Sequence, residues 1–300
     1  MDIEDYKLKD RLLKGITADG NFKISVVKTT EVVKTAKANH NLSLLNTVIL
    51  GRALTAVMLM ASELKGEERI QLRMDGNGPI GFVVAEANQV GEIRGYVQNP
   101  EVELDYSEAG TELGDGIGLG ILTFSKILYN EAEPRVSKIQ LIKGDVTSDI
   151  AHYLAQSEQV PSAVLLDVGI DKEGEVTEAG GLLIQRLPGA PDGQIDILQE
   201  RLASFPPLSQ MFEDDQYIDD IMEKAISPLQ YKELNRNPVD FFCRCTRKRF
   251  LDAFTMLNYE DLKEMEGESQ EVICQYCNRK EMISKEEIEN LITDAKAKLN

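Results

Sequence analysis

The four cysteines constrain this chain more than any other feature of its sequence. They form two close pairs near the C-terminus, Cys243-Arg-Cys245 and Cys274-Gln-Tyr-Cys277, with twenty-eight residues between the pairs. Two short pairs joined by a loop are typical of a tetrahedral zinc site with four thiolate ligands, which leaves no open position for a substrate. The sequence therefore predicts one Zn²⁺ bound by Cys243, Cys245, Cys274 and Cys277; the alternative is a set of buried free thiols.

Two interpretations of such a site remain open. Most zinc sites with four thiolates only hold a small fold together. In the first pair, however, one residue separates the cysteines, where two to four are usual. Four basic residues also surround that pair: Arg244, Arg247, Lys248 and Arg249. Positive charge favours the thiolate, which is the form that binds metal and also the form that oxidants attack. The second interpretation is therefore a zinc site whose cysteines also react with oxidants.

Length and charge exclude several classes of protein. Three hundred residues suffice for two domains and a sizeable core. A net charge of −18 argues against non-specific binding to nucleic acid, whose phosphates attract Lys and Arg. The acidic start, residues 1–5, contains no apolar export segment. The apolar stretch 42–64 includes Arg52 and Glu63, so we expect a buried core helix rather than a membrane span. These features point to a reducing compartment, where paired cysteines serve metal or redox chemistry rather than a disulfide scaffold.

Hydrophobic periodicity predicts an α+β domain over residues 1–187. Apolar residues alternate or cluster, as in strands, within 22–26, 70–74, 80–87, 93–97, 119–124, 136–142, 164–168 and 182–185. Helical patterns cover 43–64, with Ser43 as the N-cap, and 147–156. Strands in runs, with helices beside them, predict an antiparallel sheet with packed helices rather than alternating βαβ units.

The composition changes after this domain. Ten acidic and four basic residues lie between Pro188 and Asn237, and we interpret residues 188–236 as an acidic amphipathic helical linker. One helical face carries an apolar stripe that needs a partner surface; its predicted docking residues are Ile218, Ile221, Met222, Ile226 and Leu229. Ordinary packing against the first domain would explain the stripe, and so would packing that is released under some condition. Residues 237–300 form a small zinc-binding module with few core candidates, so a metal staple is expected.

Motifs for enzymatic activity are absent or weak, and we expect no enzyme. There is no Gly-x4-Gly-Lys-Ser/Thr loop for ATP, and the two histidines, His40 and His152, lie far apart. Two other classes of function remain as alternatives. Cys274 and Cys277 could form a thiol–disulfide oxidoreductase site, although the βαβ context is lacking. The C-terminal module could instead be a zinc-ribbon adaptor.

Motifs along essentially the whole chain resemble those of the thirty-three-kilodalton heat-shock protein family, which are redox-regulated holdase chaperones of the bacterial type. Besides the C-x-C and C-x2-C pairs, they are His40-Asn-Leu-Ser43, Leu50-Gly-Arg-Ala-Leu54, Asp75-Gly-Asn-Gly-Pro-Ile-Gly81, Arg94-Gly-Tyr96, Ser157-Glu-Gln159, Ala179-Gly-Gly181 and Gln185-Arg-Leu-Pro-Gly-Ala190. Thr246 stands where a serine is common, and Glu281 where an aromatic residue is common. Neither departure affects a predicted ligand.

The resemblance implies a function and a set of partners. It implies zinc on the four cysteines in the reduced, inactive protein, and the disulfides Cys243–Cys245 and Cys274–Cys277 after oxidation and zinc release. It also implies a cytoplasmic chaperone that binds unfolded client proteins during oxidative stress without ATP and forms a homodimer when active. Nucleic acid and membrane are not expected partners.

Overall fold

The structure, a computed structural model, describes residues 7–107, 110–129, 131–191 and 193–298 and divides the chain into two compact units. The N-terminal unit is Met1–Phe242 and the C-terminal unit is Cys243–Asn300. The predicted linker, residues 188–236, lies within the N-terminal unit. The acidic start of the chain, residues 1–5, on which the expected lack of an export segment rests, lies outside the described residues.

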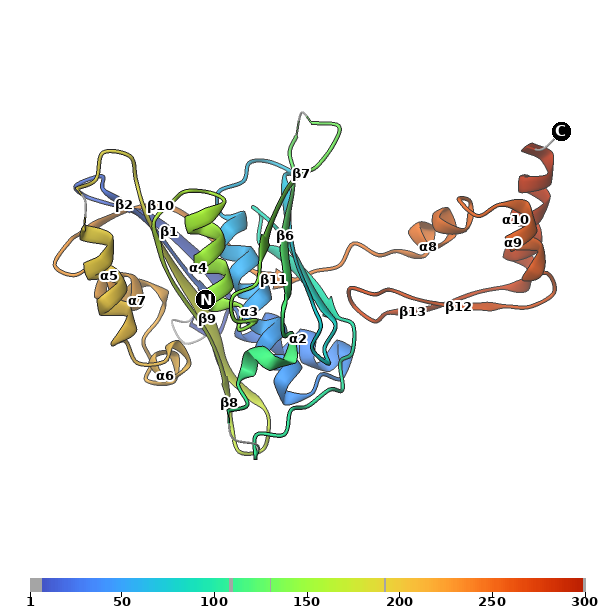
Figure 1. Ribbon diagram of the computed structural model, residues 1–300. Coiled ribbons are helices and arrows are strands. Elements are labelled where there is room, and N and C mark those ends of the chain that lie inside the picture. Colours follow the sequence, from blue (N-terminus) through green and yellow to red (C-terminus); the bar gives the residue numbers. More distant parts are fainter. Residues whose placement is uncertain (1–6, 108–109, 130, 192, 299–300) are drawn as a thin grey trace. The chain divides into compact units, whose positions relative to one another are not determined.

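Two β-sheets form the framework of the N-terminal unit (Figure 1). Sheet A has the order β10-β1-β2-β9-β8 and consists of β1 (Arg11–Thr17), β2 (Phe22–Lys28), β8 (Ser162–Ile170), β9 (Val176–Arg186) and β10 (Tyr231–Pro238). Sheet B has the order β11-β5-β4-β3-β6-β7 and consists of β3 (Arg69–Gly76), β4 (Phe82–Asn88), β5 (Glu92–Val97), β6 (Gly120–Ile127), β7 (Arg135–Gln140) and β11 (Asp240–Phe241). Neighbouring strands are antiparallel, except that β11 is parallel to β5. The predicted α+β class is confirmed.

A long apolar helix fills the space between the sheets. Helix α3 (Leu44–Ala61) follows α2 (Thr30–His40), and the short η1 (Leu113–Gly116) and α4 (Thr147–Gln156) come later in the chain. As predicted, Ser43 is the N-cap of α3, and its hydroxyl accepts the N–H of Asn46 at 3.2 Å. Helix α3 is long and apolar enough to span a membrane, but 83% of it is buried inside the protein. It packs with residues of both sheets in one core, so the predicted buried helix is confirmed.

The other face of sheet A is covered by the linker. Helices α5 (Gln194–Ala203), α6 (Leu208–Glu213) and α7 (Ile218–Ile226) lie side by side on it (Figure 1). Their apolar side chains join those of β1, β2 and β9 in a second core, which includes Leu13, Ile24 and Leu182. Sheet A is therefore apolar on both faces, and the linker segment supplies one of its two covers.

Five elements of the N-terminal unit are not among those predicted from the sequence: β1, α2, η1, β10 and β11. The linker is consequently not helical throughout, because after α7 the chain turns and adds β10 to the edge of sheet A. The predicted strands and the helix at 147–156 are all present, several of them longer than their apolar cores.

The C-terminal unit is small and lightly packed. It comprises α8 (Arg247–Phe254), α9 (Tyr259–Glu264), the hairpin of β12 (Gln270–Ile273) and β13 (Lys280–Ile283), and α10 (Lys285–Lys298). Among its described residues, the buried hydrophobic side chains are Phe254, Leu262, Ile283, Ile288 and Ile292. Five buried side chains are few for a unit of this size, which agrees with the expectation that it needs a staple.

Candidate metal centre and linker docking surface

Two short segments bring the four cysteines together. Cys243 and Cys245 lie between β11 and the start of α8, and Cys274 and Cys277 lie in the turn between β12 and β13. That turn is closed by the N–H of Asn278, which donates to the carbonyl of Cys274 at 2.8 Å. Asn278 adopts the left-handed conformation with φ of 55°, which an asparagine tolerates better than most residues. The hairpin thus curls both sulfurs of the second pair towards the first pair.

The sulfur atoms form a compact cluster. All four Sγ atoms lie within 4.8 Å of one another, and each cysteine is a partly buried free thiol. Two close approaches join the pairs, Cys243–Cys274 at 3.6 Å and Cys245–Cys277 at 3.3 Å. A tetrahedral zinc site with Zn–S bonds of about 2.3 Å places its sulfurs about 3.8 Å apart. The cluster therefore fits a single thiolate-bound metal ion.

The electrostatics of the cluster favour a cation. Burial raises the pKa of the Cys245 and Cys277 thiols, and the neighbouring Cys243 raises both further. The hydrogen bond with Cys277 lowers the pKa of Cys245, and the backbone N–H of Arg279 lowers that of Cys277. Four negative thiolates this close would repel one another, so they can coexist only around a positive charge. Arg247, one of the predicted basic neighbours, instead pairs with Glu287 at 2.7 Å and Glu281 at 3.2 Å. It ties α8 to α10 and β13.

The linker docks on sheet A through most of its predicted stripe. Ile218, Ile221, Met222 and Ile226 are each at most 1% exposed and belong to the core that α7 shares with sheet A. Leu229 differs, because α7 ends at Ile226 and the Leu229 side chain is 36% exposed beyond it.

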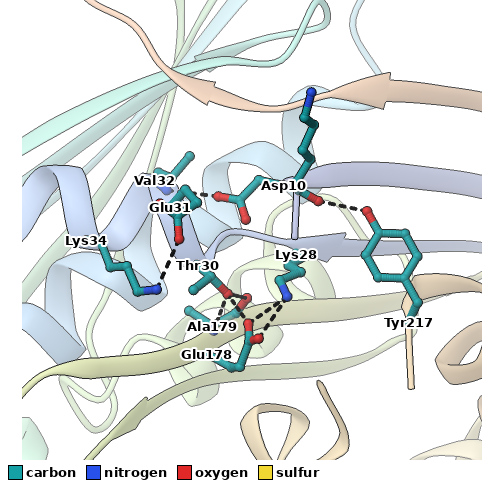
Figure 2. A network of polar contacts seen from close by, with 10 residues as sticks. Asp10, Lys28, Thr30, Glu31, Val32, Lys34, Glu178, Ala179 and Tyr217 are labelled. Atoms are coloured by element: carbon teal, nitrogen blue, oxygen red, sulfur yellow. Dashed lines mark hydrogen bonds and ion pairs between the residues drawn. The ribbon is translucent and has the colours of Figure 1, made fainter. Parts of the chain in front are cut away.

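Polar contacts that the sequence did not suggest fasten the linker to the start of β1 (Figure 2). The hydroxyl of Tyr217, the N-cap residue of α7, donates to the carbonyl of Lys9 at 2.7 Å. The carbonyl of Asp10 accepts the N–H of Val239, between β10 and β11, at 3.1 Å. The residues just before β1 thus contact both the start of α7 and the residue between β10 and β11.

The side chain of Asp10 is a buried carboxyl group with an incomplete set of partners. Its Oδ2 accepts the N–H of Val32 in the first turn of α2 at 2.8 Å, while its Oδ1 has no hydrogen-bond partner in the part of the chain that the structure describes. Burial raises the pKa of Asp10 to about 7, although the Val32 N–H and the charge of Lys28 lower it. Lys28 itself lies 2.8 Å from Glu178, as Figure 2 shows.

Comparison with known proteins identifies relatives over nearly the whole chain. The sequence model of the family described as Hsp33 protein matches residues 10–284. The 33 kDa chaperonin of Desulforamulus reducens is 35% identical over 95% of this chain and 98% of its own length. That of Streptococcus thermophilus is 36% identical over 95% of this chain and 100% of its own. The crystal structure of the 33 kDa chaperonin from Thermotoga maritima superposes with a TM-score of 0.88 at 32% identity, covering 96% of this chain and 99% of that one.

We predict that Asp10→Asn stabilises the N-terminal unit more strongly at pH 8 than at pH 5. An unfolded Asp has a pKa of about 3.9, and burial raises that of folded Asp10 to about 7. The folded state therefore binds the proton more tightly, and its stability falls as the pH rises from about 4 through 7. The amide removes this penalty, which amounts to a few kcal/mol at most. Urea unfolding of both proteins from pH 5 to pH 8 measures the difference.

Asp19→Asn is the matched control of opposite sign. Hydrogen bonds from Thr17 and Asn21 hold the pKa of Asp19 below its usual value. Replacing the Asp19 carboxylate with an amide should therefore lower the stability of the protein at pH 8. Parallel pH profiles for Asp10→Asn and the wild type would contradict the role of Asp10.

Proposed function

This chain belongs to the Hsp33 protein family of chaperones, and we propose that it is a redox-regulated holdase that binds unfolding proteins without ATP and prevents their aggregation. The observation that carries the proposal is the cluster of four cysteine sulfurs within a C-terminal unit that has few buried side chains. In this proposal the reduced, metal-bound protein is inactive and the oxidised protein is active. Cytoplasmic location and dimerisation on activation are part of the same proposal.

The four thiolates of Cys243, Cys245, Cys274 and Cys277 would hold one Zn²⁺, whose contribution is structural because no coordination position stays open. Zinc binding to such sites is worth about 10–16 kcal/mol at neutral pH. A whole domain is typically stable by only about 5–15 kcal/mol. A unit whose described residues include only five buried hydrophobic side chains would therefore unfold once its sulfurs could no longer bind metal.

Oxidation of the four thiols would remove these metal ligands. Two equivalents of hydrogen peroxide accept four electrons from the four thiols, forming the disulfides Cys243–Cys245 and Cys274–Cys277 and four molecules of water. Disulfide sulfurs are not zinc ligands, because the metal needs thiolates. Reduction by thiol–disulfide exchange regenerates the ligands, so the change is reversible.

Unfolding of the C-terminal unit would next release the linker. Helices α5 to α7 cover an apolar face of sheet A that cannot remain exposed without binding something. Once these helices leave, that face can bind apolar segments of unfolding proteins. No catalytic residue is needed for this activity.

The proposed function makes three predictions, of which the first concerns metal content. Reduced protein should contain one zinc per chain, and Cys274→Ser should lower that content at least tenfold, because three thiolates and a hydroxyl no longer complete the site. Elemental analysis after gel filtration measures both. Gln275→Ser, at an exposed position of the same turn, should retain the metal. Full zinc in the Cys274→Ser protein would contradict the assignment.

The second prediction tests the function directly. Protein oxidised with hydrogen peroxide should suppress the aggregation of heat-denatured citrate synthase at equimolar concentration, while reduced, zinc-loaded protein should not. Peptide mapping of the oxidised protein should find the two short-range disulfides. Equal activity in both redox states, or mapping that finds mainly Cys245–Cys274 links, would count against the proposed switch.

The third prediction separates the linker from the metal. Ile221→Asp combined with Ile226→Asp should activate the reduced, zinc-loaded protein. Both isoleucines are at most 1% exposed, and losing a buried isoleucine costs about 2–5 kcal/mol even before a carboxylate is buried without a partner. Aggregation assays under reducing conditions, with zinc content measured in parallel, provide the readout.

Lys224→Asp is the matched control, because it changes the net charge by the same amount at an exposed position of α7. It should stay inactive when reduced. A double variant that is folded, zinc-loaded and still inactive would show that linker docking does not control activity.

A further inference from the structure

Strand β10 occupies the edge of sheet A beside β1. The two strands pair antiparallel from Thr17–Tyr231 to Arg11–Pro238, and the register shifts once, so that Leu234 has no partner in β1. The ladder continues past β1, where the N–H of Ala18 donates to the carbonyl of Gln230 at 2.8 Å. Residues of one strand face alternate edges, so the N–H groups of Ile16 and Lys14 point towards β10 as well.

The side chains of β10 contribute little to this pairing. None of them is buried, and Lys232, Glu233, Leu234 and Pro238 are exposed. Three side chains of β10 do attach it elsewhere: the ring of Tyr231 packs on the second core, Arg236 pairs with Asp219 of α7, and Asn237 donates to the carbonyl of Gln89. The attachment of β10 to β1 itself is made by backbone hydrogen bonds, which do not depend on sequence. Any extended segment without proline at the positions whose N–H groups donate to β1 could make the same bonds.

Gly15 makes the edge tolerant of large side chains. A Cβ atom at Gly15 would lie 2.9 Å from the ring of Tyr231 and 3.2 Å from the carbonyl oxygen of Lys232. The missing side chain thus leaves room for an aromatic ring above the β1 backbone. A different strand could place its own large apolar side chain in this space.

The edge also adjoins the apolar face that α7 covers. Leu13 of β1 is fully buried in the core shared with α7, and Ile24 and Leu182 continue that face across the sheet. Strand β10 follows α7 in the chain, so release of the linker would uncover the edge and the face together. An open strand edge beside an apolar surface is a template for pairing with another chain.

We propose that an extended segment of an unfolded client replaces β10 and adds to β1 as an antiparallel strand. Alternate apolar side chains of the client would then lie on the face that α7 leaves, and its backbone would take the hydrogen bonds of β10. This inference rests on the proposed holdase function and specifies how that activity selects its partner. Backbone pairing reads no side chains, so it selects extended, proline-poor polypeptide of any sequence. The uncovered face adds a preference for segments in which every second side chain is apolar.

Residue-resolved amide exchange of the full-length protein tests the pairing. The N–H groups of Lys14 and Ile16 should exchange slowly in reduced protein and at least tenfold faster after oxidation. On binding reduced, carboxymethylated α-lactalbumin, a permanently unfolded protein, they should slow at least tenfold again. The N–H groups of Leu13 and Gly15 face β2 and should stay slow throughout, which makes them internal controls.

Three results would overturn the inference. The Lys14 and Ile16 amides could keep exchanging fast while α-lactalbumin is bound, which would leave the apolar face as the whole site. They could stay slow after oxidation without client, which would mean that β10 never leaves. They could slow again in proportion to protein concentration alone, which would identify a second copy as the occupant. Failure of the holdase function is a separate result, seen as unsuppressed aggregation of citrate synthase.

Backbone methylation of a competitor peptide provides a second test. A nine-residue peptide of alternating valine and threonine should displace α-lactalbumin from oxidised protein. Methylating alternate backbone nitrogens blocks one edge of the peptide and leaves the other, so competition should persist. Methylating every nitrogen blocks both edges and should weaken competition at least tenfold. Equal competition by both methylated peptides would overturn strand addition.

Discussion

The architecture depends on the fact that sheet A is apolar on both of its faces. One face packs on α3, which is enclosed between two sheets, and the other packs on α5, α6 and α7. Each fully buried aliphatic side chain contributes about 1.5–3 kcal/mol relative to an exposed one, so neither face can be left open without cost. The two covers differ in kind, because α3 lies between the two sheets while the linker helices lie on the outside of sheet A. The outer cover is the one that has to leave in the proposed function.

The C-terminal unit obeys a different constraint, the lack of enough hydrophobic surface. Among its described residues, five hydrophobic side chains are buried. Its four sulfurs converge where β12, β13 and the start of α8 meet. Backbone geometry at Asn278 orients the second pair, while Arg247 links the unit's helices through carboxylates. The unit thus combines a weak core with a strong potential metal site, which makes its folding sensitive to the chemistry of sulfur.

Much of this arrangement could be predicted from local sequence, and the rest depends on contacts between distant residues. Helix α3 and its cap at Ser43 follow from apolar composition and one hydroxyl, and the cysteine cluster follows from its spacing. Helix α2 was missed because Thr29 makes no side-chain cap; the N–H of Val32 is satisfied by Asp10, twenty-two residues earlier. Strand β10 was missed because it is polar and its side chains are not buried, so no alternating pattern marks it. Asp10 and Tyr217 carry no motif, and their roles depend on where the chain brings them.

The connection from β10 to β11 also determines how the fold responds to tension. Val239, which is buried, alone separates the last residue of β10 from the first residue of β11, and these two strands belong to different sheets. A pull on the chain beyond Phe242 would act first on β11, which pairs with β5 over two residues only. It would then open the β10 ladder from Pro238, one pair after another, instead of loading all its hydrogen bonds together. Strand β10 should therefore separate from β1 at low force, because its hydrogen bonds break in sequence from the C-terminal end.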